Sequence, residues 1–561
     1  MDYALALLSG ALLALSFPRY GHPAFAWIAL VPLLIALSGW SALSGVEGRG
    51  RSAPSGVGGP ERLPGQPPLR AFALGLTTGA LYFIGTIYWT GTVVRTFGGL
   101  ATPVAVLAML LLASYLALFP ALTALIGARL ITRAGTGALL LVPAAWVATE
   151  FSRGYLFGGF PWVPLGNSQV TVLPVAQLAS VFGVYGLSAL VALVNAAIAF
   201  AVLTRGRSRT IAIAATSVVL AGIGGWGGLR VADGSLTREG TPLRVGLIQG
   251  NIAQTDKWNP NEERRIFTTY VAMTRDAVRR GAEFVIWPES STPFIFEEDE
   301  AGETAVRDLA REVRVPLLFG SEQVDRGGDA VRLFNAAFLV APEGETAAVY
   351  RKMHLVPFGE YIPFKQWLYF VSPLVERLAD FAPGTSMVML PVGSHLVNTA
   401  ICYEVVYPSL IRQAVLDGSQ LLTTITNDAW YGQSSAPYQH FEMASMRAIE
   451  QGRYLARAAN TGISGVVDPY GRVVRQSAIF EEAGLVEEVR LLTSRTIYSA
   501  IGDAVAYVSI ALTAIALMMF RRVRYVPRPA RDALSLSSLG LARDDPEALE
   551  GSKGTAPAPR T

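Results

Sequence analysis

Eight long apolar segments constrain the fold of this chain more than any other feature of its sequence. A helix that crosses the hydrocarbon core of a bilayer needs about 20 mainly apolar residues. The segments are residues 2–18, 24–40, 71–94, 101–127, 138–152, 174–203, 210–228 and 500–520. The fifth is the weakest, because it is short, contains Pro143 and ends at Glu150. With only 16% charged residues, the chain is predicted to form an α-helical transmembrane bundle of about eight spans.

Loop arginines predict the orientation of this bundle. They gather in alternate loops and in the tail, at residues 41–70, 128–137, 204–209 and 521–531. The other short loops hold one each, Arg19, Arg95 and Arg153. Because positively charged loops stay in the cytoplasm, we expect both termini there and the segment before the last span on the outer face. In a bacterium, that is the periplasmic face of the inner membrane. The first apolar segment carries Asp2 instead of a basic start, so we read it as an uncleaved span rather than a signal peptide.

The composition divides the chain into four parts. We expect a bundle of about seven spans, a water-facing domain, a last span and a tail, at residues 1–228, 229–499, 500–520 and 521–561 respectively. The loop at 41–69 and the end of the tail have too few apolar residues to offset the entropy of ordering, so both are predicted to be disordered. The net charge of +3 is too small to predict a nucleic-acid partner.

Strand and helix patterns alternate in the water-facing domain. Apolar runs predict strands at residues 243–252, 284–290, 315–322, 333–340, 395–402 and 421–428. Helical spacing is present at 261–280 and 440–459, and a hairpin with a turn at Asp468–Gly471 is predicted at 462–476. Such alternation indicates a layered α/β domain. Side chains at the carboxyl ends of its strands, Glu289 and Cys402 among them, are expected at the rim where ligands bind.

Cys402 is the only cysteine of the chain, so it has no partner for a disulfide within the chain. A free cysteine is often a small buried hydrophobe, and that interpretation stays open for Cys402. The alternative is a nucleophile. The residues after it, 403–415, suggest an elbow that leads into a helix, and a thiol near a helix N-terminus gains thiolate character. Backbone N–H groups at such a turn can also receive an oxyanion.

Lys352 and Glu289 also allow two interpretations each. Lys352 is one of only four lysines in an arginine-rich chain, so it is either an ordinary surface residue or a position where a guanidinium would not serve. Glu289 follows the apolar run "FVIW" and is either a helix cap or surface carboxylate, or part of a site.

Together, Glu289, Lys352 and Cys402 resemble the Glu–Lys–Cys triad of the nitrilase, or carbon–nitrogen hydrolase, superfamily. The matching stretches are "IWPES", "YRKMHLVPFGEYIP", "TAICYEVVYP", "TNDAWYG" and "RAANTGISGVVDPYG", within about 243–490. With spans on both sides of this domain, the whole chain resembles the apolipoprotein N-acyltransferase family. The resemblance implies an αββα sandwich and transfer of a fatty acyl chain from a phospholipid to the α-amine of a diacylglyceryl-modified apolipoprotein. It implies no metal and no other cofactor, and we expect a monomer.

The resemblance also implies roles for individual residues. Glu289 would be the general base and Cys402 the nucleophile that carries a thioester. The Lys352 ammonium and the Tyr403 backbone N–H would hold the oxyanion, and Glu360 would keep Lys352 charged. Glu404 matches a further functional position of the family, although Tyr403 and Glu404 would also serve simply to stabilise the elbow.

Several aromatic residues are candidates for binding the lipid substrate. Trp258 and Trp430 would line an acyl or headgroup pocket, or pack at the border between domain and membrane. The segment 361–374 holds five aromatic residues, Trp367 and Phe370 among them, and only one charge. Since aromatic side chains favour the membrane interface, we expect this segment to enter the outer leaflet as a lid, with ordinary packing on the domain as the alternative.

Two other functions remain possible at this point. A membrane-tethered amidase or nitrilase would have the same triad and use water as the acceptor. A transporter or receptor would have charged residues inside its spans, whereas the segments hold few, mainly Glu150 and Asp503 near their ends. The four histidines, His22, His354, His395 and His440, are scattered and show no metal-ligand spacing.

Overall fold

The computed structural model describes residues 1–39, 65–327, 331–361 and 380–520. Residues Met1–Leu517 form one compact unit, and a second unit begins at Met518, close to the end of the described residues. The apolar helices and the α/β domain therefore belong to the same unit.

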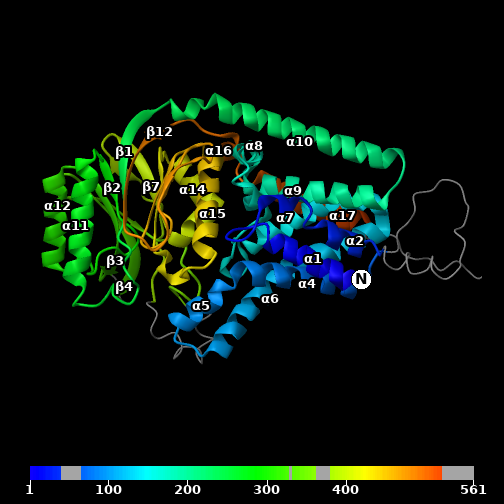
Figure 1. Cartoon of the computed structure of the whole chain (residues 1–561), viewed down its shortest axis with the longest axis horizontal. Helices are drawn as coiled ribbons and strands as arrows, with labels where there is room; N and C mark the ends of the chain where they lie inside the picture. Colours follow the sequence, from blue (N-terminus) through cyan, green and yellow to red (C-terminus); the bar gives the residue numbers. More distant parts are fainter. Residues whose placement is uncertain (40–64, 328–330, 362–379, 521–561) are drawn as a thin grey trace, which may run out of the picture. The chain divides into compact units, whose positions relative to one another are not determined.

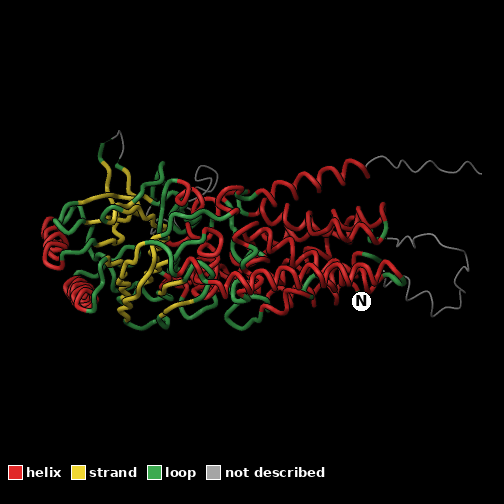
Figure 2. The backbone as a smooth tube through the Cα atoms, turned by 90° about the horizontal axis from the view of Figure 1, so that it is seen from above, coloured by secondary structure: helices red, strands yellow, loops and turns green. Residues whose placement is uncertain are grey.

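Each predicted apolar segment contains helix. The helices are α1 (Asp2–Ala14), η1 (Pro23–Trp27), α2 (Val31–Leu37), α4 (Pro68–Ile87), α5 (Trp89–Thr96), α6 (Thr102–Ala134), α7 (Val142–Arg153), α8 (Leu173–Ala176), α9 (Ala179–Leu203), α10 (Arg207–Asp233) and α17 (Ala504–Met519). Figure 2 shows the long helices running side by side. A Cβ on Gly75 or Gly79 of α4 would lie within 2.8 Å of the Cα of Ala121 or Ala117 of α6, so the small residues permit this close packing.

The expectation of about eight spans needs correction. Among the described residues, four helices are long and apolar enough to cross a membrane, at Pro68–Ile87, Thr102–Ala134, Ala179–Leu203 and Arg207–Thr237. Three more apolar helices are shorter, at Asp2–Ala14, Pro23–Leu37 and Ala504–Met519. The expected fifth span is the 12-residue helix α7. It is short because Pro143 lies in its first turn, after the 3₁₀ stretch Thr136–Leu141, and the helix ends before Gly154.

The α/β domain contains two six-stranded sheets. The first has the order β12-β1-β2-β3-β4-β5, and the second has the order β11-β10-β9-β8-β7-β6. The first sheet comprises β1 (Thr241–Gln249), β2 (Phe284–Ile286), β3 (Leu317–Asp325), β4 (Arg332–Val340), β5 (Thr346–Arg351) and β12 (Ala483–Leu491). The second comprises β6 (Leu390–Val392), β7 (His395–Ile401), β8 (Leu422–Thr426), β9 (Leu455–Ala459), β10 (Gly465–Val467) and β11 (Val473–Gln476).

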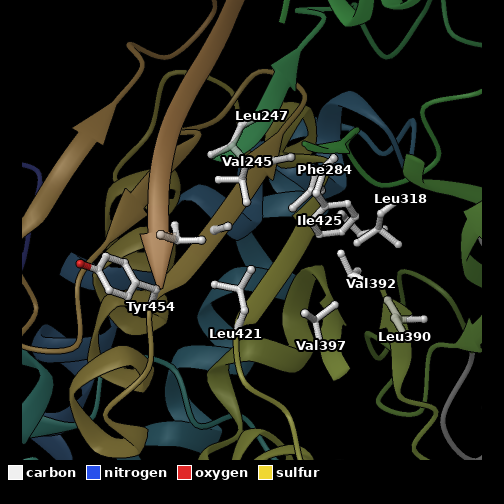
Figure 3. Packing of buried hydrophobic residues seen from close by; sticks show 14 of the residues in the cluster. Val245, Leu247, Phe284, Leu318, Leu390, Val392, Val397, Leu421, Ile425 and Tyr454 are labelled. Atoms are coloured by element: carbon white, nitrogen blue, oxygen red, sulfur yellow. The ribbon is translucent and has the colours of Figure 1, made fainter. Parts of the chain in front are cut away.

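The sheets pack face to face because their strands alternate in side-chain direction. In β2, Phe284 and Ile286 join a buried cluster shared with Val397 and Ile425 of the second sheet, as Figure 3 shows in part. Val285 points the other way, toward α11 (Glu263–Arg279) and α12 (Glu300–Val313), which cover the outer face in Figure 1. Helices α14 (Pro408–Leu416) and α15 (Ala436–Gln451) accompany the second sheet. The predicted αββα sandwich is therefore present.

Two predictions of secondary structure have different outcomes. The hairpin at 462–476 is confirmed as β10 and β11, which pair antiparallel. The helix expected at 440–459 is wrong at its C-terminal end, because α15 ends at Gln451 and residues Leu455–Ala459 form β9. Gly452 has a left-handed φ of +60° and caps the helix, which turns the chain back into the sheet.

Helix α15 also packs against the apolar helices. Met446 and Ile449 of α15 share a buried cluster with Val184 and Leu187 of α9. Trp162, in the segment between α7 and α9, donates an Nε1–H bond of 2.7 Å to Oε1 of Gln439. Helix α15 thus joins the second sheet to the membrane part, and it also contacts η7 (Cys402–Val406), the short helix that begins at Cys402.

Candidate active site

The three candidate catalytic side chains come from the ends of three strands. Glu289 follows β2 and Lys352 follows β5, both in the first sheet, whereas Cys402 follows β7 in the second. All three are buried, with 6%, 1% and 5% of their surface exposed, respectively. The structure therefore places at strand ends three buried residues that lie well apart in the chain, with Lys352 lying 63 positions after Glu289.

The Glu289 carboxylate is held by donors on both oxygens. Oε1 accepts hydrogen bonds from the Asn335 side chain at 2.8 Å and from the Lys352 ammonium at 3.2 Å. Oε2 accepts one from the backbone N–H of Asn427 at 2.8 Å. Burial alone would raise the pKa of this carboxyl, but Lys352 and the other donors hold the pKa below its usual value. Glu289 is therefore ionised and ready to accept a proton.

Lys352 lies between two carboxylates. Its Nζ is 3.2 Å from Oε1 of Glu289 and 2.8 Å from Oε1 of Glu360. The Asn335 side chain also donates to Glu360, at 2.9 Å. Burial opposes the charge of Lys352, but the two carboxylates raise its pKa above the usual range, so the ammonium stays charged. We call Glu289, Asn335, Lys352 and Glu360 the carboxylate cluster.

Cys402 lies at a sharp turn between a strand and a short helix. Strand β7 ends at Ile401, and the 3₁₀ helix η7 (Cys402–Val406) begins at Cys402 itself. The φ angle of Cys402 is +52°, a left-handed conformation that costs a non-glycine residue about 1–2 kcal/mol. The predicted elbow is present, and its strain is stored at the candidate nucleophile.

The expectation of an activated thiolate at Cys402 is wrong for the free protein. Burial and the nearby Glu289 carboxylate raise the pKa of the thiol to about 12, and Lys352 offsets only part of this effect. Thr426 and Tyr431 both form side-chain hydrogen bonds with the thiol. The resting pair is therefore an ionised Glu289 and a protonated Cys402, which favours proton removal during attack over a preformed thiolate.

Glu404 connects the elbow to the segment that follows Lys352. Its Oε1 accepts hydrogen bonds from the Tyr350 hydroxyl and from the backbone N–H groups of Met353 and His354, and its Oε2 accepts one from the Ile401 N–H. Burial raises the pKa of Glu404 to about 7, against these donors, which favour the ionised form. Glu404 thus stabilises the elbow and fixes its distance from the Lys352 strand.

Tyr403 joins the elbow to the membrane part through its side chain. Its hydroxyl donates a hydrogen bond of 3.2 Å to the Gly159 carbonyl, in the segment between α7 and α9. Its ring stacks on Trp162 with the ring centroids 6.4 Å apart, and Trp162 also contacts Tyr431. An aromatic residue of the segment between α7 and α9 therefore contacts the residue next to Cys402.

The remaining candidates have different surroundings. Trp258 is 48% exposed, and Trp430, in η8 (Asp428–Tyr431), packs edge-on against Phe97 at 4.7 Å, where it joins α5 to the domain. Trp367 and Phe370, with most of the expected lid at 361–374, lie outside the described residues.

Sequence reasoning missed four residues around this site. Asn335 is an unremarkable position in an apolar run, yet it bonds to both carboxylates of the carboxylate cluster. Asp428, His440 and Arg457 form a buried group behind Cys402. Asp428 and Arg457 lie in two of the quoted motifs, but their pairing depends on strand register, which the sequence does not reveal. Within the described part of the chain, no group of three or more His, Cys, Asp or Glu side chains is arranged to hold a metal ion.

Comparisons with known proteins identify similar sequences and a solved structure. The sequence profile of the carbon–nitrogen hydrolase family matches residues 244–497, and that of the apolipoprotein N-acyltransferase N-terminal domain matches residues 61–197. The apolipoprotein N-acyltransferase of Geobacter metallireducens is 39% identical over 93% of this chain and 96% of its own length. The enzyme of that name from Methylococcus capsulatus is 33% identical over 89% and 92%. A solved mutant amidase from Nesterenkonia sp. AN1, with acrylamide added at its active-site cysteine, is 21% identical over 47% of this chain and 97% of its own, with a TM-score of 0.36.

Proposed function

This chain belongs to the apolipoprotein N-acyltransferase family, a group of bacterial membrane enzymes, and from that premise we propose that it acylates lipoproteins through a thioester on Cys402. The acyl donor is a membrane phospholipid. The acceptor is the α-amine of a diacylglyceryl-modified cysteine at the N-terminus of an apolipoprotein. The observation that carries the proposal is the buried contact of 3.2 Å between the Glu289 carboxylate and the Lys352 ammonium, together with the buried Cys402 at its strained elbow.

In the first step, Glu289 takes the proton from the Cys402 thiol as sulfur attacks the ester carbonyl of the phospholipid. The Lys352 ammonium and the Tyr403 backbone N–H stabilise the oxyanion, and one such donor typically contributes about 3–4 kcal/mol. The ester C–O bond breaks, and the lysophospholipid leaves with the proton held by Glu289. The acyl group remains on sulfur as a thioester.

In the second step, the α-amine of the acceptor attacks the thioester, and Glu289 accepts a proton from the amine. The C–S bond breaks, an amide forms, and the proton returns to Cys402. Because a thioester is more reactive than the amide that replaces it, the transfer proceeds without ATP. Glu360 serves both steps by keeping Lys352 charged between two carboxylates.

The membrane topology is part of the same proposal. Loop arginines favour cytoplasmic termini and a catalytic domain, residues 229–499, on the periplasmic face. We further propose that the three shorter apolar helices lie in the bilayer with the four long ones, because each belongs to an apolar segment. The protein acts as a monomer, since all three residues of the triad come from one chain.

Intact-mass spectrometry tests the thioester directly. The detergent-solubilised full chain is mixed with phosphatidylethanolamine, and a fatty-acyl adduct is expected on the wild type but not on Cys402→Ala. Adding a synthetic diacylglyceryl lipopeptide should discharge the adduct and yield the N-acylated peptide. Release of free fatty acid without peptide acylation would indicate a hydrolase instead. Peptide acylation with no adduct at any time would contradict the two-step route.

A further inference from the structure

A second buried cluster adjoins Cys402 and shares no residue with the carboxylate cluster. It consists of Asp428 at the start of η8, His440 in α15 and Arg457 in β9, and we call it the histidine cluster. All three side chains have no exposed surface. Arg457 Nη2 lies 2.8 Å from Oδ2 of Asp428 and 3.0 Å from Nδ1 of His440. The other imidazole nitrogen, Nε2, is 3.1 Å from the carbonyl oxygen of Cys402.

The partners of His440 determine where its proton lies. The Cys402 carbonyl can only accept a hydrogen bond, so Nε2 carries the proton and donates it. Nδ1 lies 3.0 Å from Arg457 Nη2, which can only donate, and 3.1 Å from Oδ1 of Asp428, which can only accept. In the neutral ring, with the proton on Nε2, Nδ1 accepts the hydrogen bond from Arg457. Burial lowers the pKa of His440, with the Arg457 charge acting in the same direction, which agrees with a neutral ring. Burial would raise the pKa of Asp428, but Arg457 and His440 hold it at about 2, so this carboxylate balances the guanidinium.

The histidine cluster differs from a Cys–His–Asp nucleophile activation system. In such a system, an imidazole nitrogen faces the thiol and removes its proton. Here, the imidazole faces the backbone carbonyl of Cys402, while Glu289 acts electrostatically on the thiol. The cluster therefore holds the backbone of the nucleophile and leaves its proton to the carboxylate cluster.

We propose that His440 is a positioning residue for acyl transfer, which holds the strained Cys402 elbow through a hydrogen bond from Nε2 to the Cys402 carbonyl. Cys402 has a disfavoured φ of +52°. A fixed hydrogen-bond partner for its carbonyl therefore limits rotation of the neighbouring peptide units, which determine the positions of the sulfur and of the Tyr403 N–H. Asp428 and Arg457 fix the tautomer and the ring orientation of His440.

Contacts with the membrane part place a second constraint on this position. The His440 ring lies 5.6 Å from the Trp162 ring, and the neighbouring Gln439 accepts a hydrogen bond from Trp162. Gln439 also donates to the Pro18 carbonyl at 3.1 Å. Two loops of the apolar part thus contact the helix turn that carries His440. These contacts support the hydrogen bond from His440 to the Cys402 carbonyl.

This proposal rests on the thioester chemistry proposed above, and three substitutions test it. His440→Gln keeps an N–H near the Nε2 position, His440→Asn places its N–H near Nδ1, and His440→Leu removes both. Each full-length variant is treated with p-nitrophenyl acetate and, separately, with iodoacetamide, and the mass of Cys402 adducts is followed with time. Acylation requires an aligned oxyanion site, whereas alkylation requires an accessible sulfur that can lose its proton but no oxyanion site. Val466→Ala, a core change in β10, is the control for lost stability alone.

Since a misplacement of about 1 Å costs about 10²-fold, we expect acylation to fall by at least about tenfold in His440→Asn and His440→Leu. His440→Gln should stay within about threefold of the wild type, and alkylation within about threefold in every variant, because the sulfur remains reachable. Val466→Ala should lower the melting temperature without this separation of rates.

Three results would each overturn the proposal. These are equal losses of acylation in His440→Gln and His440→Asn, unchanged acylation in His440→Asn, and parallel losses of acylation and alkylation. The Gln and Asn pair decides the question if His440→Leu does not fold. A wild type that is acylated by p-nitrophenyl acetate, but not by phosphatidylethanolamine, would overturn the proposed donor and leave the role of His440 testable.

Discussion

The carboxylate cluster and the histidine cluster both adjoin Cys402, but the first acts mainly on its thiol and the second forms a hydrogen bond with its carbonyl. In the carboxylate cluster, one ammonium is shared by two carboxylates, so the cluster has a net negative charge next to the thiol. In the histidine cluster, one carboxylate is paired with one guanidinium around a neutral imidazole, so the charges balance next to the carbonyl. A cluster with excess negative charge can accept a proton, whereas a balanced one holds its partners in place.

This difference shows that burial and ion pairing alone do not identify a catalytic group. Glu289 and Asp428 are both buried, both accept several hydrogen bonds and both have a lowered pKa. They differ in how strongly they act on the thiol, because Glu289 raises the pKa of Cys402 more than Asp428 does, and Asp428 is paired with a permanently charged guanidinium. Ionisation of Glu289 is therefore coupled more strongly to the reactivity of the sulfur than ionisation of Asp428.

The largest effect is expected from Glu289→Gln. Removing a general base typically costs about 10²–10⁴-fold, so formation of the acyl adduct should fall by that factor. The same change should lower the pKa of Cys402 from about 12, because the carboxylate raises it and Lys352 remains. The acylation rate and the pH profile of iodoacetamide alkylation measure the two effects separately.

Asp428→Asn is the matched control for Glu289→Gln, since it also neutralises a buried carboxylate. It should leave the alkylation profile of Cys402 much closer to that of the wild type. The proposed difference between the two clusters is incorrect if both substitutions shift the alkylation profile equally. It is also incorrect if Glu289→Gln leaves the acylation rate within tenfold of the wild type.

Lys352→Met should have the next largest effect, and it should change both activity and stability. Loss of one oxyanion donor costs about 10²–10³-fold in rate. Glu289 and Glu360 would also be left buried without their cation, and breaking a buried ion pair costs about 3–5 kcal/mol. Adduct formation and thermal unfolding in detergent report the two losses. Arg265→Met, in an exposed pair with Glu262, should change neither by a comparable amount.

Arg457→Met should act mainly on stability and on its dependence on pH. The pKa of Asp428 is about 2 in the folded protein against an ordinary value of 3.8, which corresponds to about 2 kcal/mol. Because the folded-state pKa is lowered, this stability is present above about pH 4 and is lost as the pH falls toward 2. Without Arg457, the melting temperature should be lower at pH 7 and fall less between pH 5 and pH 3. If the melting temperature of the variant falls between pH 5 and pH 3 as much as that of the wild type, the lowered pKa of Asp428 does not depend on Arg457.

The sequence predicted the parts of this molecule that depend on local pattern. The sandwich follows from apolar runs and quoted motifs, and Glu289, Lys352 and Cys402 do meet, as three strand ends in two facing sheets. The number of membrane spans was harder to predict. Pro143 and Gly154 limit helix α7 to 12 residues, whereas hydropathy alone indicates a longer apolar segment. The expected thiolate character of Cys402 was wrong because the local sequence indicates a helix N-terminus but reveals neither the burial of the thiol nor the nearby Glu289 carboxylate.

The histidine cluster was hidden for a related reason. Asp428, His440 and Arg457 come from a turn after β8, a helix and β9, and only the pairing of parallel strands β8 and β9 brings them together. Their spacing in sequence resembles no ligand or triad motif. Likewise, Tyr403 and Gly159 are 244 positions apart, and neither segment has a sequence pattern that predicts their contact.

Tyr403→Phe should give the smallest effect and tests how the apolar helices support the elbow. The ring would keep its stacking on Trp162, whereas the hydroxyl bonds to the Gly159 carbonyl and with the Tyr407 side chain would be lost. One such hydrogen bond contributes about 1 kcal/mol, so a small fall in melting temperature and less than a tenfold loss of acylation are expected. Tyr403→Ala should cost several times more, because it also removes the stacked ring. If Phe and Ala are equally damaging, the hydroxyl rather than the ring couples the bundle to Cys402, and the elbow depends on the polar contacts of this hydroxyl.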